Sequence, residues 1–85
     1  MKANLVVLHC AKKHGLSDSD IESAWRNAVA VQQRNFDPPC HYAVAGPDSV
    51  GRMCELLLAE QEDGTFIVYH AMKLTVKMAA ELNLL

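Results

Sequence analysis

The sequence predicts an α+β fold with two N-terminal helices, a three- to four-stranded antiparallel β-meander and a short C-terminal helix. Three observations lead to this expectation. The chain has 85 residues, which is the length of one domain. Apolar side chains recur at helical spacing from Ile21 to Ala28. The dipeptide Asp63-Gly64 separates two apolar runs, and this is a strong short-range signal for a β-hairpin. We therefore treat residues 1–85 as a single domain.

The first segment allows two interpretations. The run Asn4–Leu8 contains β-branched residues, which favour a strand. A basic run stands directly before Gly15, however, and this is the pattern of a helix C-terminus with its glycine in the left-handed conformation. We expect a helix over residues 3–14 and leave the strand open as the alternative.

The second helix is expected to begin at Ser17. A serine at this position can cap the helix, and acidic residues in the first turn favour the positive end of the helix dipole. Four apolar side chains then form one stripe, of which Trp25 is the expected anchor in the core. The stripe consists of Ile21, Ala24, Trp25 and Ala28.

Extended segments are expected through the middle of the chain. If Asp63-Gly64 forms a two-residue loop, Leu57 pairs with His70, and both faces of the hairpin are largely apolar. Both faces must then be covered, by helices or by a partner. A short helix over Lys73–Leu82 should close the domain. The expected strands are Val29–Arg34, Cys40–Ala45, Arg52–Gln61 and Thr65–Ala71.

Charge and composition limit the classes of function. The net charge is −2, whereas nucleic-acid binders usually carry a basic excess. This counts against tight, non-specific binding of RNA or DNA and leaves room for a local basic cleft. The hydrophobic fraction of 51% is slightly high, which suggests that another chain covers some apolar surface.

The compartment follows from what the sequence lacks. Three cysteines without a close pair argue against a disulfide framework. No stretch approaches the ~20 apolar residues of a membrane span, and the run Leu5–Leu8 is too short for a signal peptide. We expect a cytoplasmic protein with no membrane partner.

Common catalytic and metal-binding signatures are absent from the sequence. It contains no phosphate-binding loop, no nucleophile elbow, no HExxH and no paired CxxC. Cys40 and His41 are neighbours on an expected strand, so their side chains point to opposite faces. We expect no cofactor and no metal, and a metalloregulator is the least favoured function.

A cluster of polar residues is expected where the last strand meets the final helix. On the pairing above, Glu55 lies diagonally across from His70, and a carboxylate can orient an imidazole for proton transfer. Arg52 and Lys73 could bind phosphate and stabilise a pentacoordinate phosphorus. Such a cluster suits phosphodiester cleavage. Each residue also has an ordinary structural explanation, for example His70 as a histidine at the edge of the core.

Three segments follow one another in the sequence: Lys13–Ser17, Tyr42–Gly46 with Gly51-Arg52, and Tyr69–Lys73. In this order they resemble the BrnT-like toxins, which are grouped with the RelE-type ribonuclease toxins. Lys13-His14-Gly15-Leu16-Ser17 is similar to the Lys-His-Gly-Val-Ser junction of that family. Tyr42–Gly46 followed by Gly51-Arg52 is similar to its central strands. Tyr69–Lys73 is similar to its Ile-Ser-Ala-Arg segment, with His70 in place of serine and Met72 in place of arginine.

This resemblance implies a function and a set of partners. It implies an endoribonuclease toxin of a bacterial toxin–antitoxin pair that needs no metal, inhibits translation and is neutralised by a cognate antitoxin protein. RNA, including ribosome-associated mRNA, is the implied substrate. The expected RNA contacts are Lys13, His14 and Lys77, and the expected catalytic set is His70, Lys73, Arg52 and Glu55. Homo-oligomerisation stays open. The alternative function is a non-catalytic module, a degenerate toxin fold that binds a partner protein.

Overall fold

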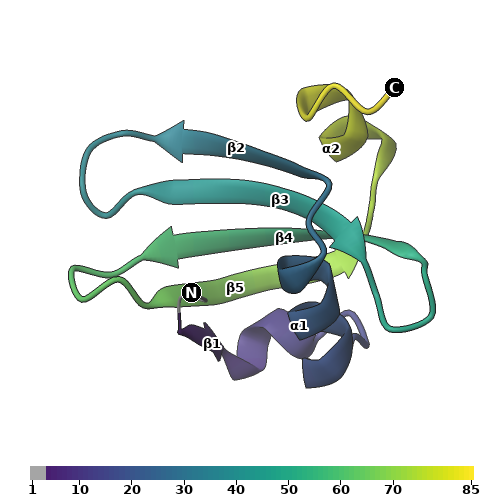
Figure 1. The fold of residues 1–85 in the computed structure, drawn as a ribbon, viewed down its shortest axis with the longest axis horizontal. Coiled ribbons are helices and arrows are strands. Elements are labelled where there is room, and N and C mark those ends of the chain that lie inside the picture. The colour runs from purple at the N-terminus through teal and green to yellow at the C-terminus, as the bar shows by residue number, and fades with distance from the viewer. Residues whose placement is uncertain (1–3) are drawn as a thin grey trace.

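The computed structural model describes residues 4–85 as a five-stranded mixed sheet with two α-helices (Figure 1). The strands lie in the order β1-β5-β4-β3-β2; β1 runs parallel to β5, and the other neighbours are antiparallel. The elements are β1 Leu5–Val7, a 3₁₀ helix His9–Lys12, α1 Asp18–Arg26, β2 Ala30–Asn35, β3 His41–Pro47, β4 Met53–Glu60, β5 Phe66–Lys73 and α2 Val76–Glu81.

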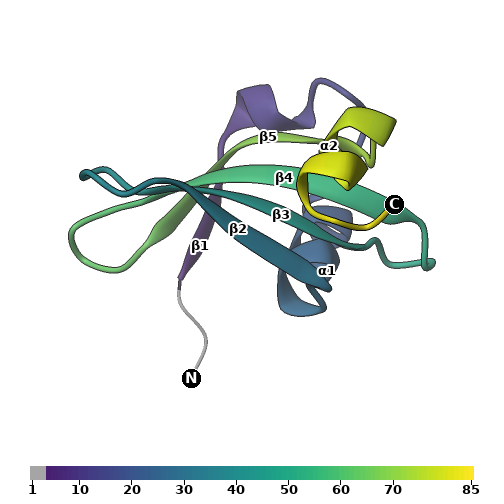
Figure 2. The same ribbon diagram turned by 90° about the horizontal axis from the view of Figure 1, so that it is seen from above.

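The two α-helices lie on opposite faces of the sheet (Figure 2). The α1 face carries the larger core, and its members come from the 3₁₀ helix, from α1 and from β3, β4 and β5. The α2 face carries a smaller core under α2. The α1 core contains Ala11, Ile21, Ala24, Val44, Cys54, Leu56, Leu58, Val68 and Ala71. The α2 core contains Ala43, Ala45, Met78 and Leu82.

Helix α1 begins where its capping residues predict. The Ser17 hydroxyl accepts a hydrogen bond from the Asp20 N–H at 3.1 Å, and the Ser17 N–H donates to the Asp20 carboxylate at 3.4 Å. These two bonds form a capping box. Ile21 and Ala24 are fully buried, and Trp25 packs on the core against the Phe66 ring, with a centroid separation of 4.9 Å. The expected second helix is present, but it ends at Arg26, so Ala28 of the expected stripe packs against the core from beyond the helix.

The expected arrangement of two N-terminal helices and a meander is wrong. The helix expected over residues 3–14 is a strand followed by one 3₁₀ turn, and Ala3 lies outside the described residues. Leu5–Val7 pairs with Phe66–Val68 of β5, so a long-range ladder outweighs the local helical spacing. The basic run before Gly15 does mark a helix end, because Gly15 has a φ of +91°, but that helix has only four residues.

The expected hairpin is present with a different loop. Glu60 pairs with Phe66, and the Gln61 N–H donates a hydrogen bond to the Thr65 carbonyl oxygen at 2.8 Å. The loop between these bonded ends therefore has three residues, 62–64, rather than two. Gly64 has a φ of +88°, which suits a three-residue hairpin loop. The expected pair Leu57 and His70 is nevertheless observed, because the register shifts between Leu57 and Leu58.

The final helix is shorter than expected. Lys73 is the last residue of β5, where it pairs with Cys54, and it does not begin the helix. Thr75 is the N-cap of α2, and its hydroxyl accepts a hydrogen bond from the Met78 N–H at 3.2 Å. Within residues 4–85, no helix is long and apolar enough to cross a membrane.

Gly46 allows α1 to lie directly on β3. A Cβ atom at this position would overlap the carbonyl oxygen of Ala24 and lie 2.9 Å from its carbonyl carbon. Both atoms belong to the helix backbone, so the helix would have to move away.

We therefore predict that Gly46→Ala destabilises the fold by about 2–4 kcal/mol, because α1 loses its contact with the sheet. Gly64→Ala is the control, since its added methyl group meets no atom within 4 Å. Only the positive φ of this position disfavours alanine, which should cost about 1 kcal/mol of stability. Urea unfolding measures both variants. A Gly46→Ala protein as stable as Gly64→Ala would contradict the close approach.

Candidate functional site

A buried carboxylate connects β4, β5 and α2. Glu55 on β4 is only 4% exposed. One of its oxygens lies 3.1 Å from Nε2 of His70 on β5. The other accepts hydrogen bonds from the Thr75 N–H at 2.9 Å and from the Thr75 hydroxyl at 2.7 Å. The expected proximity of Glu55 and His70 is thus present, and Thr75 is an added partner.

The hydrogen bonds keep Glu55 ionised despite its burial. Burial by itself raises the pKa of a carboxyl group, because the charged form loses water. Here the donors on Thr75 and the ring of His70 outweigh burial, and the pKa of Glu55 is lowered below its ordinary value of 4.5. An ionised Glu55 can therefore hold the His70 ring with one N–H pointing at the carboxylate and the other nitrogen free for chemistry.

A second imidazole stands beside the first. The rings of His14 and His70 meet edge to face with centroids 5.6 Å apart. The 3₁₀ helix packs against β5, and the chain then turns at Gly15, whose φ of +91° an L side chain rarely adopts. This turn holds His14 at the edge of the sheet next to β5. Two imidazoles within one site can divide the two proton transfers of an acid–base reaction.

Arg52 is held by the turn between β3 and β4. The Asp48 carboxylate accepts hydrogen bonds from the N–H groups of Val50 and Arg52 and from Nε of the Arg52 side chain, each at 2.9 Å. Burial raises the pKa of Asp48, but these donors outweigh burial and lower it. The Arg52 side chain is still 62% exposed, so its guanidinium is fixed at Nε and open to solvent.

These groups converge on one cleft. A hollow of about 280 Å³ lies where the ends of β4 and β5 meet the chain after the 3₁₀ helix. It brings together three of the expected site residues, His14, Arg52 and Lys73, and His14 connects it to the Glu55–His70 pair. The cleft is lined by His14, Gly15, Leu16, Asp48, Arg52, Met72 and Lys73.

Two expected RNA contacts lie outside the cleft lining. Lys13 is exposed and precedes His14 in the chain, so it lies at the rim. Lys77 is exposed on α2 and is not among the residues that line the cleft. Five of the seven expected residues, His14, Glu55, Arg52, His70 and Lys73, therefore form one connected group.

Sequence reasoning missed the role of Thr75 and the contact between Tyr69 and His41. Thr75 could have been identified as an N-cap, because a threonine stands three residues before Met78 at the start of an apolar stripe. Tyr69 and His41 contact each other on the α2 face of the sheet, with the Tyr69 hydroxyl 3.0 Å from Nδ1 of His41. No sequence signal indicated that contact, because it joins β3 to β5 across the intervening strand β4.

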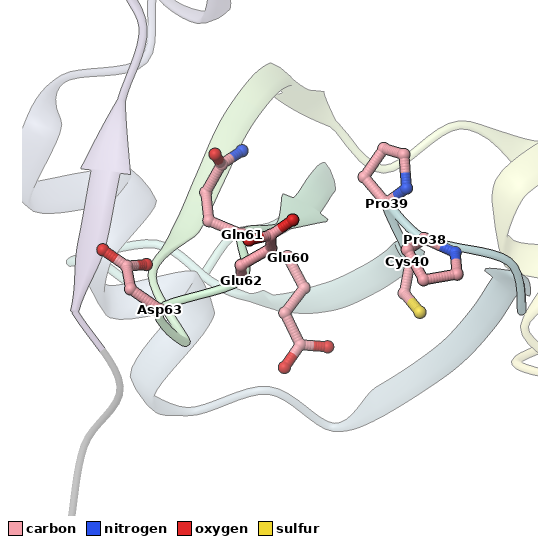
Figure 3. A pocket seen from close by; sticks show the side chains of 7 residues that line it. All are labelled: Pro38, Pro39, Cys40, Glu60, Gln61, Glu62 and Asp63. Atoms are coloured by element: carbon pink, nitrogen blue, oxygen red, sulfur yellow. The ribbon is translucent and has the colours of Figure 1, made fainter.

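A larger cavity of about 700 Å³ lies at the opposite end of the meander (Figure 3). It opens between the β2–β3 and β4–β5 turns, and its charged side chains are all acidic. The cavity is lined by Pro38, Pro39, Cys40, Glu60, Gln61, Glu62 and Asp63.

Across residues 4–85, no cluster of three or more His, Cys, Asp or Glu side chains is arranged to hold a metal ion.

Comparisons of the chain with protein-family models, with curated proteins and with solved structures give no match. The family resemblance and the roles of the site residues therefore stay predictions.

We predict that Glu55→Gln destabilises the protein by about 1.5–3 kcal/mol at pH 7, because charge-assisted hydrogen bonds to a buried group are lost. The lowered pKa means that Glu55 stabilises the fold above pH 4.5 and loses this effect as the pH falls through its folded pKa. The cost of the substitution should therefore shrink in acid.

Urea unfolding at pH 7 and at acid pH measures this difference. Glu60→Gln is the matched control, because Glu60 is less buried and a glutamine oxygen can still accept the hydrogen bond from the Tyr42 hydroxyl. The account fails if the two substitutions cost the same, or if the cost of Glu55→Gln does not change with pH.

Proposed function

We propose that this domain is a metal-independent endoribonuclease and the toxin of a bacterial toxin–antitoxin pair. One observation carries the proposal. The buried Glu55 carboxylate fixes His70 at 3.1 Å, and the ring of His14 beside it lines a cleft that also holds Arg52 and Lys73. Imidazoles for proton transfer and cations for phosphate are the groups that RNA cleavage needs.

The chemistry uses the ribose 2′-hydroxyl as nucleophile. His70, oriented by Glu55, accepts the proton of the 2′-hydroxyl as its oxygen forms a bond to phosphorus. The bond between phosphorus and the 5′-oxygen breaks, and a protonated His14 donates a proton to that leaving oxygen. The products are a 2′,3′-cyclic phosphate and a 5′-hydroxyl, and no further reactant is consumed. Glu55 acts on His70 only and is a positioning residue.

The cations supply the electrostatic part of catalysis. Arg52 and Lys73 would bind the non-bridging phosphate oxygens, whose negative charge grows in the transition state. The Asp48 carboxylate accepts a hydrogen bond from Nε of Arg52, and the terminal nitrogens of the exposed guanidinium can still bind an anion. A net charge of −2 is compatible with this site, because the acidic groups of the second cavity lie at the other end of the meander.

The partners follow from the same proposal. The cytoplasmic substrate would be RNA, including ribosome-associated mRNA, and a cognate antitoxin would cover the active cleft or an apolar surface. Exposed apolar side chains support the need for a partner. Val29, Val31 and Phe36 are 59%, 60% and 74% exposed along and beside the edge strand β2.

The same exposed edge favours the second candidate, a non-catalytic module that binds a partner protein. Within residues 4–85, no strand pairs with the outer side of β2. This strand carries neither lysine nor proline to discourage pairing, and its charged residue, Arg34, is bound to Glu81. This candidate predicts no RNA cleavage and a complex that Val31→Lys disrupts without changing the stability of the domain.

We predict that purified protein cleaves RNA in the presence of EDTA and that His70→Ala lowers the rate by at least about 100-fold, because a general base is removed. Lys73→Ala should lower it by about tenfold or more. Induction of the unaltered chain in a bacterium without antitoxin should arrest growth and fragment RNA, and the double variant should relieve both effects.

Two controls match these substitutions. His9→Ala removes an exposed imidazole from the 3₁₀ helix, and Arg26→Ala removes an exposed cation from α1, on the opposite face from Glu55 and His70. Both should cleave RNA like the unaltered chain. Undiminished cleavage or growth arrest by the His70 and Lys73 double variant would overturn the assignment of the site.

A further inference from the structure

A bulge in β5 turns two consecutive side chains to the same face of the sheet. Leu58 pairs with Val68 and Leu57 with His70, which leaves Tyr69 without a partner on β4. Val68 and Ala71 both lie in the α1 core although they are three residues apart. The two residues between them, Tyr69 and His70, therefore both lie on the α2 face, where Tyr69 contacts His41 and His70 contacts Glu55.

Tyr69 and His41 form an aromatic pair beside the proposed catalytic histidine. Their ring centroids are 5.6 Å apart, the ring planes make an angle of 65°, and the Tyr69 hydroxyl lies 3.0 Å from Nδ1 of His41. Both residues are only half-buried. The core under helix α2 includes Ala43 and Ala45 farther along β3, and neither Tyr69 nor His41 belongs to it.

The cation Arg34 lies on β2, on the side of the aromatic pair away from His70. Arg34 donates two hydrogen bonds to the Glu81 carboxylate on α2, each 2.7 Å long. Asn35, the next residue of β2, pairs with His41, and the bonds to Glu81 of α2 place the Arg34 guanidinium on the α2 face. Burial raises the pKa of Tyr69, and the positive charge of Arg34 opposes this shift. This part of the α2 face thus presents an imidazole, two aromatic rings and a cation in succession: His70, Tyr69, His41 and Arg34.

We propose that Tyr69 and His41 form a stacking platform for an unpaired nucleobase next to the phosphate that is cleaved. This inference rests on the proposed function and names its substrate class, single-stranded RNA. The platform is continuous with the proposed active site, because Tyr69 and His70 are consecutive residues on one face. Aromatic faces accept every base, so the platform favours unpaired over duplex RNA and discriminates weakly between base types.

Direct binding of a non-cleavable strand tests the platform. The probe is a fluorescent hexaribonucleotide with 2′-methoxy groups, which cannot form the cyclic phosphate. Tyr69→Leu removes the ring and should weaken binding by about tenfold, within the roughly 5- to 150-fold expected for one stacked base. Tyr69→Phe keeps the ring, loses only the hydroxyl, and should bind within about twofold of the unaltered chain. Both variants should bind inorganic phosphate like the unaltered chain.

A second measurement does not depend on any variant. A set of probes with one abasic position each should show one position at which the unaltered chain loses about tenfold in affinity. The platform is overturned if no abasic position has this effect, if Tyr69→Leu binds as the unaltered chain does, or if Tyr69→Phe loses as much as Tyr69→Leu.

The outcomes separate the platform from the proposed function. Cleavage that depends on His70 but not on Tyr69 would support the ribonuclease activity and contradict the platform. Probe binding that depends on the Tyr69 ring, in a protein that cleaves no RNA, would support the platform as a binding site and contradict the catalytic proposal. No binding of the probe by the unaltered chain would overturn the platform.

Discussion

The Glu55 carboxylate is the constraint on which the arrangement of the site depends. A buried carboxylate is unfavourable unless donors replace the lost water. Thr75 provides two donors from the start of α2, and His70 provides a third contact from β5. Because these partners belong to different elements, satisfying one charge fixes the N-terminus of α2 against the sheet and the orientation of the imidazole together. The stability of the fold and the geometry of the site are thereby coupled.

The bulge at Tyr69 makes the contact between His70 and Glu55 possible. Val68 faces α1, so strict alternation would place Tyr69 on the α2 face and return His70 to the α1 core, away from Glu55. One extra residue in β5 reverses this and brings His70 to the carboxylate. Strand β5 pairs with β4 on one side and β1 on the other, which holds the strand where it must deviate. Tyr69 lies on the α2 face with or without the bulge, and the bulge brings His70 to the same face, so the imidazole and the aromatic pair become neighbours there.

The parts of the fold that depend on neighbouring residues could be predicted from the sequence. The cap at Ser17, the stripe of α1 and the hairpin at Asp63-Gly64 are local signals, and the structure contains all three. The parallel pairing of β1 with β5 joins residues about sixty positions apart, so the ambiguous run Asn4–Leu8 could not reveal it. The proximity of Glu55 to His70 was expected from a β4–β5 register that is wrong near the turn. The bulge shifts the register by one residue, so the expected pair of Leu57 and His70 forms after all. The burial of Glu55 depends on α2, and its partner Thr75 was not considered.

The central claim is that an imidazole held by a buried carboxylate removes the proton of a ribose 2′-hydroxyl. Analysis of the ends of RNA cleaved by the purified protein tests it most directly, with a matched strand that lacks the 2′-hydroxyl at the cleaved position. The account predicts a 2′,3′-cyclic phosphate and a 5′-hydroxyl as the new ends, and no cleavage of the deoxy-substituted strand at that position. New ends with a 5′-phosphate, cleavage that continues without the 2′-hydroxyl, or intact RNA throughout would contradict it.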